Sequence, residues 1–348
     1  MRRLTIIAAS AILLASCSGN TAVTDLTRAT RVTPEDEYYI FTLNENVTRT
    51  HVYYDTKFGI ELAADLYTSK DLDTTQKYPA IIIGPPYGGV KEQGPGVYAN
   101  ELARRGFIAI AFDPAYHGYS GGHPRYTTSS STYAEDFLAS VDFAGSLNYV
   151  DRNKISVLGI CGSGGFAISA ASMDSRIKAV MTSAMYDIAG FNNSVGGDMR
   201  KGMIEMASQQ RWADQDSGEE PKAMIAYPDH PLDELPAEIS GTNIEWWTFY
   251  ATKRGWHPNA RGNSTIASMP DMMTLPGTNH IADISPRPIL FITGDIAHSR
   301  AFSEEAYARA SEPKELYITP GAMHIDLYDD TSKIPFDKIE QFLKDHLN

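Results

Sequence analysis

The chain has 348 residues, of which 43% are hydrophobic and 21% charged, enough material for one large domain or two small ones. This composition excludes a chain that is disordered throughout. The formal net charge of −13 disfavours a nucleic-acid backbone or an anionic lipid surface as a partner, because like charges repel. The two cysteines, Cys17 and Cys161, are too few for a disulfide framework or a multi-thiolate metal site.

The N-terminus carries the pattern of an export signal. Two arginines precede an apolar stretch over residues 4–15, which is too short to span a bilayer. Residues 14–17 read Leu-Ala-Ser-Cys and resemble the lipobox of bacterial lipoproteins, in which cleavage precedes a lipidated cysteine. We therefore expect a signal peptide over 1–16 and lipidation of Cys17. Because Ser18 is not an aspartate, the resemblance implies an anchor in the outer membrane of the cell envelope; an ordinary secretory signal is the alternative.

Residues 17–37 are polar and lack apolar periodicity, so we expect a flexible tether there and a folded domain over 38–348. Alternation over residues 51–54 and 60–67 predicts an antiparallel hairpin. Continuous apolar runs, typical of strands covered on both faces, follow at 80–83, 107–112, 155–158, 177–181, 289–292 and 316–318. Helical patterns lie between them, at 97–105, 133–147, 165–173, 303–310 and 336–346. This alternation predicts an α/β fold whose doubly wound sheet is mostly parallel and begins with antiparallel strands.

One long interval, residues 187–286, breaks the alternation. It holds helical patterns at 199–210 and 244–253 among many Pro, Gly, Asn and Asp residues. An interval of this length is not a structureless loop in a compact domain, so we expect a helical cap inserted over one end of the sheet. We interpret its aromatic residues as the core of the cap, with a cavity wall as the alternative. They are Trp246, Trp247, Phe249, Tyr250 and Trp256.

A nucleophile-elbow pattern follows the strand at 155–158. Residues 159–165 read Gly-Ile-Cys-Gly-Ser-Gly-Gly and lead into an alanine-rich helical run. So tight a turn needs small residues two positions before and after the nucleophile, and around Cys161 these are Gly159 and Ser163. Because the start of a helix favours thiolate over thiol, we expect the Cys161 sulfur to be exposed at the bend and partly ionised.

Three other interpretations of this segment remain open. The elbow could instead present Ser163, flanked by Cys161 and Gly165, although the position of the turn directly after the strand favours Cys161. Residues 162–167 also fit a dinucleotide fingerprint with Asp187 as the ribose ligand, but that fingerprint usually occupies the first strand-helix unit. The third interpretation is a buried, inert cysteine.

The elbow needs a base and an orienting acid. His324 follows the last predicted strand, so it is expected at the same sheet edge as Cys161 and is the best base candidate among nine histidines. Asp295 follows the preceding strand and is the candidate acid.

A tetrahedral intermediate also needs hydrogen-bond donors for its oxyanion. One is the backbone N–H of Gly162, the residue after the nucleophile. The second is expected in the loop after the strand at 80–83. Because Pro85 and Pro86 have no N–H, Tyr87 is the expected donor, with Gly88 as the alternative.

Together with residues 88–93 and 294–300, the elbow resembles that of bacterial YcjY-like hydrolases, relatives of the dienelactone hydrolases in the α/β-hydrolase superfamily. The resemblance covers residues 38–348. It implies the α/β-hydrolase fold, with Cys161 as nucleophile and His324 as base.

The acid of these families does not carry over directly. Most relatives place an aspartate three residues after the glycine that ends the strand, and here that position is Ala297. Either Asp295 or Asp326 substitutes, or the triad is incomplete.

We therefore expect a hydrolase that cleaves a small carboxylic ester, lactone or thioester through an acyl-enzyme on Cys161, without a metal or organic cofactor and without a nucleic-acid partner. A binding protein that kept the hydrolase scaffold but lost turnover, and a serine esterase that uses Ser163, are the alternatives. The sequence does not indicate the natural substrate or the oligomeric state.

Overall fold

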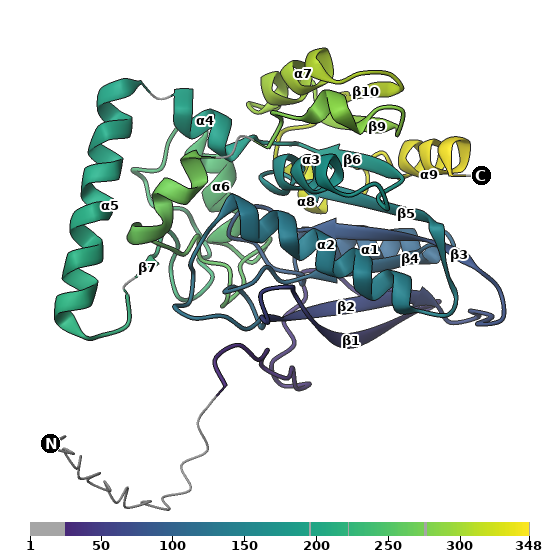
Figure 1. Cartoon of the computed structure of the whole chain (residues 1–348), viewed down its shortest axis with the longest axis horizontal. Coiled ribbons are helices and arrows are strands. Elements are labelled where there is room, and N and C mark those ends of the chain that lie inside the picture. The colour runs from purple at the N-terminus through teal and green to yellow at the C-terminus, as the bar shows by residue number, and fades with distance from the viewer. Residues whose placement is uncertain (1–24, 195, 222, 275–276, 348) are drawn as a thin grey trace, which may run out of the picture.

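The computed structural model describes residues 25–194, 196–221, 223–274 and 277–347 (Figure 1). The predicted signal peptide and Cys17 lie outside these residues. Of the helices that are described, none has the length and apolar character needed to cross a membrane.

An eight-stranded sheet in the order β1-β2-β4-β3-β5-β6-β9-β10 forms the centre of the molecule. The strands are β1 (Val47–Asp55), β2 (Glu61–Ser69), β3 (Tyr78–Gly84), β4 (Ile108–Phe112), β5 (Val150–Ile160), β6 (Ala179–Ser183), β9 (Ile289–Gly294) and β10 (Lys314–Thr319). Strand β2 runs antiparallel to both β1 and β4, and the other neighbours are parallel. The hairpin and the six strands predicted from apolar runs are confirmed, but the expected burial on both faces is wrong for β10, an edge strand that is half-buried over residues 314–318.

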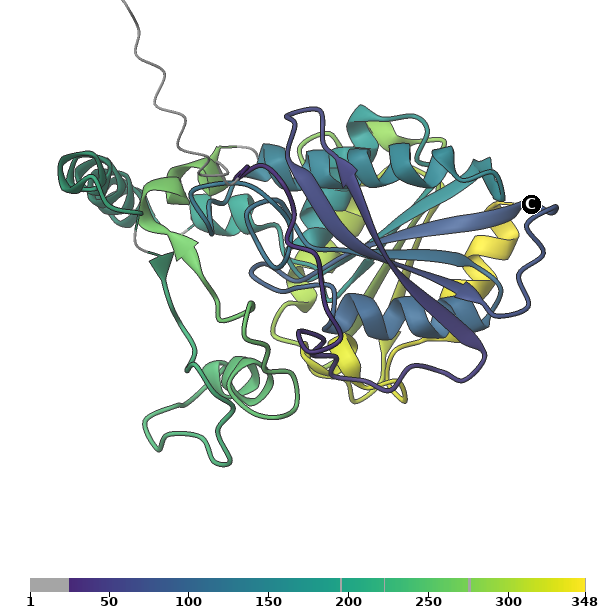
Figure 2. The ribbon, with the colours of Figure 1, turned by 90° about the horizontal axis from the view of Figure 1, so that it is seen from below.

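Helices cover both faces of this twisted sheet (Figure 2). They are α1 (Gly94–Arg104), α2 (Ser130–Ser146), α3 (Ser163–Met173), α7 (Arg300–Arg309), α8 (Asp326–Asp329) and α9 (Phe336–His346). Successive strand residues therefore enter different cores: Ile81 and Ile83 pack with α1 and α9, whereas Ile82 packs with α2 and α3. Burial on both faces explains why the inner strands β3, β4, β6 and β9 read as continuous apolar runs.

The segment between β6 and β9 is the predicted insertion. It contains α4 (Ile188–Ser194), α5 (Gly197–Ser217), β7 (Ala223–Met224), α6 (Asn243–Tyr250), β8 (Ser264–Thr265), η1 (Ile266–Met273) and η2 (Ile281–Ile284). Most of it lies beyond the edge where the parallel strands end, with α5 outermost, at the left of Figure 1. The insertion is therefore placed beside any site built at that edge.

The folded part begins earlier than predicted. The carbonyl of Leu26 accepts the N–H of Gly122, and Ala29 is buried with its N–H bonded to the Glu61 carboxylate. Arg31 donates two hydrogen bonds to the same carboxylate. The prediction of a free tether over residues 17–37 is thus wrong for this described part, because its backbone and Arg31 bind the edge of the domain.

Candidate active site

The bend between β5 and α3 falls at Cys161, whose φ of 54° lies in the left-handed region. Such a conformation is costly for a residue with a side chain and is found mainly at functional sites. A Cβ on Gly159 would lie 2.0 Å from the backbone oxygen of Ser163, so only glycine fits there. Ser163 lies in the first turn of α3, and its buried hydroxyl donates to the Pro85 carbonyl. The geometry therefore places Cys161, and not Ser163, at the bend between the strand and the helix.

The Cys161 sulfur is buried, with the residue only 5% exposed. Burial raises the pKa of its thiol to about 11, although hydrogen bonds with the Tyr328 hydroxyl and with the N–H groups of Gly162 and Tyr87 act in the opposite direction. The expectation of an exposed, partly ionised sulfur is therefore wrong for this structure, because desolvation outweighs the hydrogen bonds that favour the thiolate. The two N–H groups expected to form the oxyanion hole both bond to the sulfur.

His324 is fully buried and has a hydrogen-bond partner on each ring nitrogen. Its Nδ1 lies 2.6 Å from the Ser299 hydroxyl and its Nε2 lies 3.0 Å from the Tyr328 hydroxyl. Burial, reinforced by the nearby His298, holds the pKa of His324 well below its ordinary value. The imidazole is thus neutral at pH 7 and able to accept a proton, and Tyr328 lies between it and the Cys161 sulfur.

The orienting contact predicted for Asp295 is made by Ser299 instead. Asp295 is exposed at the end of β9, whereas Ser299 is the N-cap residue of α7 and is buried. Asp326, the other candidate acid, accepts hydrogen bonds from the Met323 N–H and from Arg254. The Nδ1 atom of His324, the candidate base, is therefore held by a neutral hydroxyl, and neither of the two candidate carboxylates is hydrogen-bonded to the ring.

Tyr328 and Ser299 were missed at the level of sequence. The spacing of four residues between His324 and Tyr328 places both on one side of a helical turn, and this is the signal that could have indicated Tyr328. Ser299 lies within residues 294–300, one of the segments that resemble the YcjY-like hydrolases, but that resemblance did not indicate which residue of the segment contacts the imidazole.

The insertion contributes directly to the site. The ring of Trp246 on α6 lies 4.7 Å from the His324 ring. Phe249 and Tyr250 of the same helix are buried, but in the core that they share with the central sheet and not in a separate core of the insertion. The neighbouring Glu245 bonds to His298 Nδ1 at 3.2 Å and accepts the Ile325 N–H at 3.4 Å.

A second contact of the insertion lies at α8. Arg254 forms a two-armed ion pair with Asp329 and a further contact with Asp326. Together with Glu245, Arg254 fixes the loop that carries the imidazole from the side of the insertion.

Buried charges support the loop that carries Tyr87. The Lys91 ammonium is fully buried in an ion pair with Glu92 and lies 3.7 Å from the Asp65 carboxylate. The Lys91 N–H donates to Asp113, a carboxyl whose pKa burial raises to about 7. These contacts fix the segment that directly follows Tyr87 in the chain.

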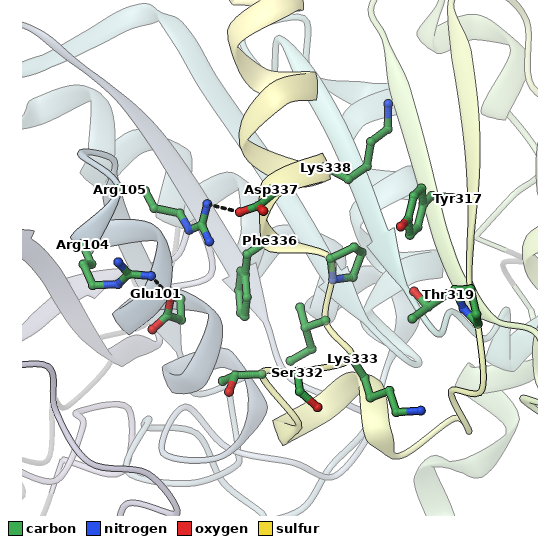
Figure 3. Close-up of a pocket in the computed structure, with 14 residues that line it drawn as sticks. Glu101, Arg104, Arg105, Tyr317, Thr319, Ser332, Lys333, Phe336, Asp337 and Lys338 are labelled. Carbon is green, nitrogen blue, oxygen red and sulfur yellow. Dashed lines mark hydrogen bonds and ion pairs between the residues drawn. The ribbon is translucent and has the colours of Figure 1, made fainter.

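A cavity of about 640 Å³ lies elsewhere, between α1, β10 and the start of α9 (Figure 3). Its charged side chains are largely paired, as in the contacts of Arg104 with Glu101 and of Arg105 with Asp337. The lining includes none of the elbow or imidazole residues, so this cavity is separate from the candidate active site.

The chain is similar to several known proteins. A family model described as X-Pro dipeptidyl-peptidase (S15 family) matches residues 59–259. The uncharacterized protein PA2218 of Pseudomonas aeruginosa is 46% identical over 88% of this chain and 83% of its own, and its crystal structure superposes with a TM-score of 0.85 over 91% of this chain and 98% of that one. The uncharacterized protein YcjY of Escherichia coli is 36% identical over 78% of this chain and 89% of its own.

More distant relatives share the fold. A thiohydrolase of Eupenicillium brefeldianum is 24% identical over 81% of this chain and 89% of its own. The α/β-hydrolase GrgF of a Penicillium species has a TM-score of 0.68 at 22% identity, over 86% of this chain and 99% of that one. Two bacterial relatives, PA2218 and YcjY, exceed 30% identity over most of their length. Because the family model spans more than half of the chain, the chain belongs to the S15 family of α/β-hydrolase-fold hydrolases.

Proposed function

We propose that this protein hydrolyses a thioester or an activated carboxylic ester through an acyl-enzyme on Cys161. One observation carries the proposal: a cysteine in the left-handed conformation between β5 and α3, with the N–H groups of Gly162 and Tyr87 bonded to its sulfur. A sulfur that attacks a carbonyl carbon from this position leaves the carbonyl oxygen beside the same two donors.

The resting site holds a neutral thiol and a neutral imidazole. Attack therefore requires that the thiol proton move toward His324 as the bond between sulfur and carbon forms. The acyl-enzyme is then hydrolysed by a water molecule that loses its proton to the same imidazole. Ser299 orients the ring but brings no negative charge to stabilise the imidazolium that forms.

This absence of a carboxylate on the imidazole favours substrates with good leaving groups. An amide needs a strong proton donor to expel its amine, whereas a thiolate or an activated alkoxide leaves with little protonation. The thiohydrolase named among the relatives supports the same substrate class. We therefore expect cleavage of thioesters and activated esters, and no cleavage of the X-Pro peptides that give the family its name.

The second candidate is a binding protein that has lost turnover. The observation that favours it is the hydroxyl of Ser299 at the position where a triad carries its acid. Loss of that acid in a serine triad costs about four orders of magnitude in turnover.

The test is a substrate panel of acyl thioesters, p-nitrophenyl esters and an X-Pro p-nitroanilide, assayed with the wild-type chain, Cys161→Ala and Ser163→Ala. The proposal predicts hydrolysis of the first two classes, a loss of roughly 10³-fold or more in Cys161→Ala, and substantial activity in Ser163→Ala. Activity that survives in Cys161→Ala contradicts the proposal, and activity lost only in Ser163→Ala identifies a serine esterase. A wild-type chain that binds these compounds saturably without hydrolysing any of them supports the binding protein.

We further propose that the chain is a lipoprotein of the cell envelope, anchored through Cys17. The lipobox-like residues 14–17 support this, and the domain starts soon afterwards, at about residue 26. Expression in a bacterium fed a radiolabelled fatty acid tests it. Label in the wild-type protein and none in Cys17→Ser is the expected result, and equal label in both contradicts it.

A further inference from the structure

Tyr328 occupies the space between the candidate nucleophile and the candidate base. Its hydroxyl lies 3.0 Å from His324 Nε2 and also bonds with the Cys161 sulfur. The side chain is fully buried, and its ring lies against Phe249 at 5.2 Å and the His324 ring at 5.2 Å. Burial and the adjacent Cys161 raise the pKa of the Tyr328 hydroxyl well above its ordinary value, so this group keeps its proton at rest.

The hydrogen bonds of the imidazole allow two proton arrangements. In one, Nδ1–H donates to the Ser299 hydroxyl, Nε2 accepts from Tyr328, and Tyr328 accepts from the thiol. In the other, Ser299 donates to Nδ1, Nε2–H donates to Tyr328, and Tyr328 donates to the sulfur. A carboxylate at the position of Ser299 would permit only the first, because it can only accept.

We propose that Tyr328 is a catalytic residue that carries the proton between Cys161 and His324. The inference rests on the proposed function and extends it. As the sulfur attacks, a bond forms between sulfur and the acyl carbon, and the π electrons of the carbonyl move to its oxygen. The thiol proton passes to the Tyr328 oxygen while the Tyr328 proton passes to Nε2, so the phenol remains neutral and the imidazole becomes imidazolium.

The same path runs backwards when the intermediate collapses. The electron pair on oxygen re-forms the carbonyl and the bond to the leaving group breaks. That group takes a proton from Tyr328, which is reloaded from the His324 imidazolium. His324 returns to the neutral imidazole, and the Tyr328 phenol carries no charge before or after the step.

The packing around Tyr328 holds its side chain in one position, as a residue that transfers a proton between two fixed groups requires. Its backbone N–H donates to the Ile325 carbonyl at 2.9 Å, and a Cβ on Gly94 would lie only 3.1 Å from its carbonyl oxygen. With backbone and ring both held, the hydroxyl stays on the line between sulfur and imidazole.

The test is Tyr328→Phe, with Tyr98→Phe as the matched control. Tyr98 is also fully buried and loses hydrogen bonds of its hydroxyl to Ser183 and to the Leu327 carbonyl in the control. The rate of acylation by an activated thioester, measured in a single turnover, should fall about 100-fold or more in Tyr328→Phe and stay within a few-fold of wild type in Tyr98→Phe. In wild type the acylation rate should depend non-linearly on the D2O fraction, because two protons move together, and Tyr328→Phe should lose that curvature.

An acylation rate in Tyr328→Phe that equals or exceeds the wild-type rate overturns the inference. That result is expected if Tyr328 only packs against its neighbours, or if its hydroxyl keeps His324 from reaching the sulfur. If Tyr328→Phe keeps the wild-type rate but Cys161→Ala is inactive, only the inference about Tyr328 fails and the proposed function is retained. If Cys161→Ala is active, the proposed function itself is refuted. If Tyr328→Phe does not fold, 3-fluorotyrosine at position 328 retains the ring and lowers the hydroxyl pKa. A proton carrier then shows an altered acylation rate and pH profile; unchanged values overturn the inference.

Discussion

Replacement of Ser299 by alanine tests the unusual partner of the imidazole. The 2.6 Å bond between the Ser299 hydroxyl and His324 Nδ1 is fully buried, so Ser299→Ala leaves a ring nitrogen without a partner. An unsatisfied buried polar group costs about 1–3 kcal/mol. If this bond holds the ring in place for proton transfer, kcat/KM for a thioester falls by roughly 10- to 100-fold, since each factor of ten corresponds to about 1.4 kcal/mol.

This loss is much smaller than the roughly 10⁴-fold loss that follows removal of the aspartate from a serine triad, because a neutral hydroxyl stabilises the imidazolium less than a carboxylate does. The matched control is Ser303→Ala on the same helix, where the buried hydroxyl has no hydrogen-bond partner in the described part of the chain. Its kcat/KM should equal that of wild type. Unchanged kcat/KM in Ser299→Ala, or a loss as large as in a carboxylate triad, refutes this account of the orienting group.

Three further changes test the elbow, the supporting loop and the thiol. Gly159→Ala should lower the free energy of unfolding by about 3 kcal/mol or more, because the new Cβ would lie 2.0 Å from a backbone oxygen. The control is Gly145→Ala on α2, where a Cβ would have no contact closer than 3.7 Å, so the change should be neutral or stabilising by up to about 1 kcal/mol. Urea denaturation measures both free energies. Lys91→Met should cost about 3–5 kcal/mol in the same assay, because it leaves Glu92 buried without its cation, and a loss below about 1 kcal/mol contradicts the pairing. In a Cys17→Ser chain, the alkylation rate of native Cys161 by iodoacetamide should still rise above pH 9 and level off near pH 11; a plateau near pH 8 contradicts the raised pKa.

The same shift of the Cys161 pKa predicts a pH dependence of stability. The folded state binds the thiol proton more tightly than the unfolded state does, so this contribution is complete below the ordinary thiol pKa. It is lost as the pH rises toward 11.

The order of strands and helices could be predicted because local patterns carry it. Burial on both faces produces the continuous apolar runs, and the tight bend at Cys161 requires the glycine at position 159. The predicted α5 over residues 199–210 was too short, since the helix spans Gly197–Ser217 and is mostly exposed, with little apolar periodicity to mark its ends.

The parts of the site that the sequence did not indicate depend on contacts between distant segments. Asp295 follows the expected strand, but the chain turns its carboxylate to solvent and brings Ser299 to the imidazole. The raised pKa of Cys161 is a consequence of its burial in the folded chain, and no local sequence pattern reports that burial. Trp246 was interpreted as core of the insertion, yet its ring lies against His324.

The central claim is that Cys161 receives the acyl group. Its most direct measurement is the mass of the chain after brief incubation with an activated acyl thioester, followed by fragmentation of the peptide that contains residues 155–176. The account predicts one acyl group on Cys161, removable by neutral hydroxylamine as a thioester is, and no adduct in Cys161→Ala. An acyl group on Ser163, resistant to neutral hydroxylamine and retained in Cys161→Ala, would contradict the account.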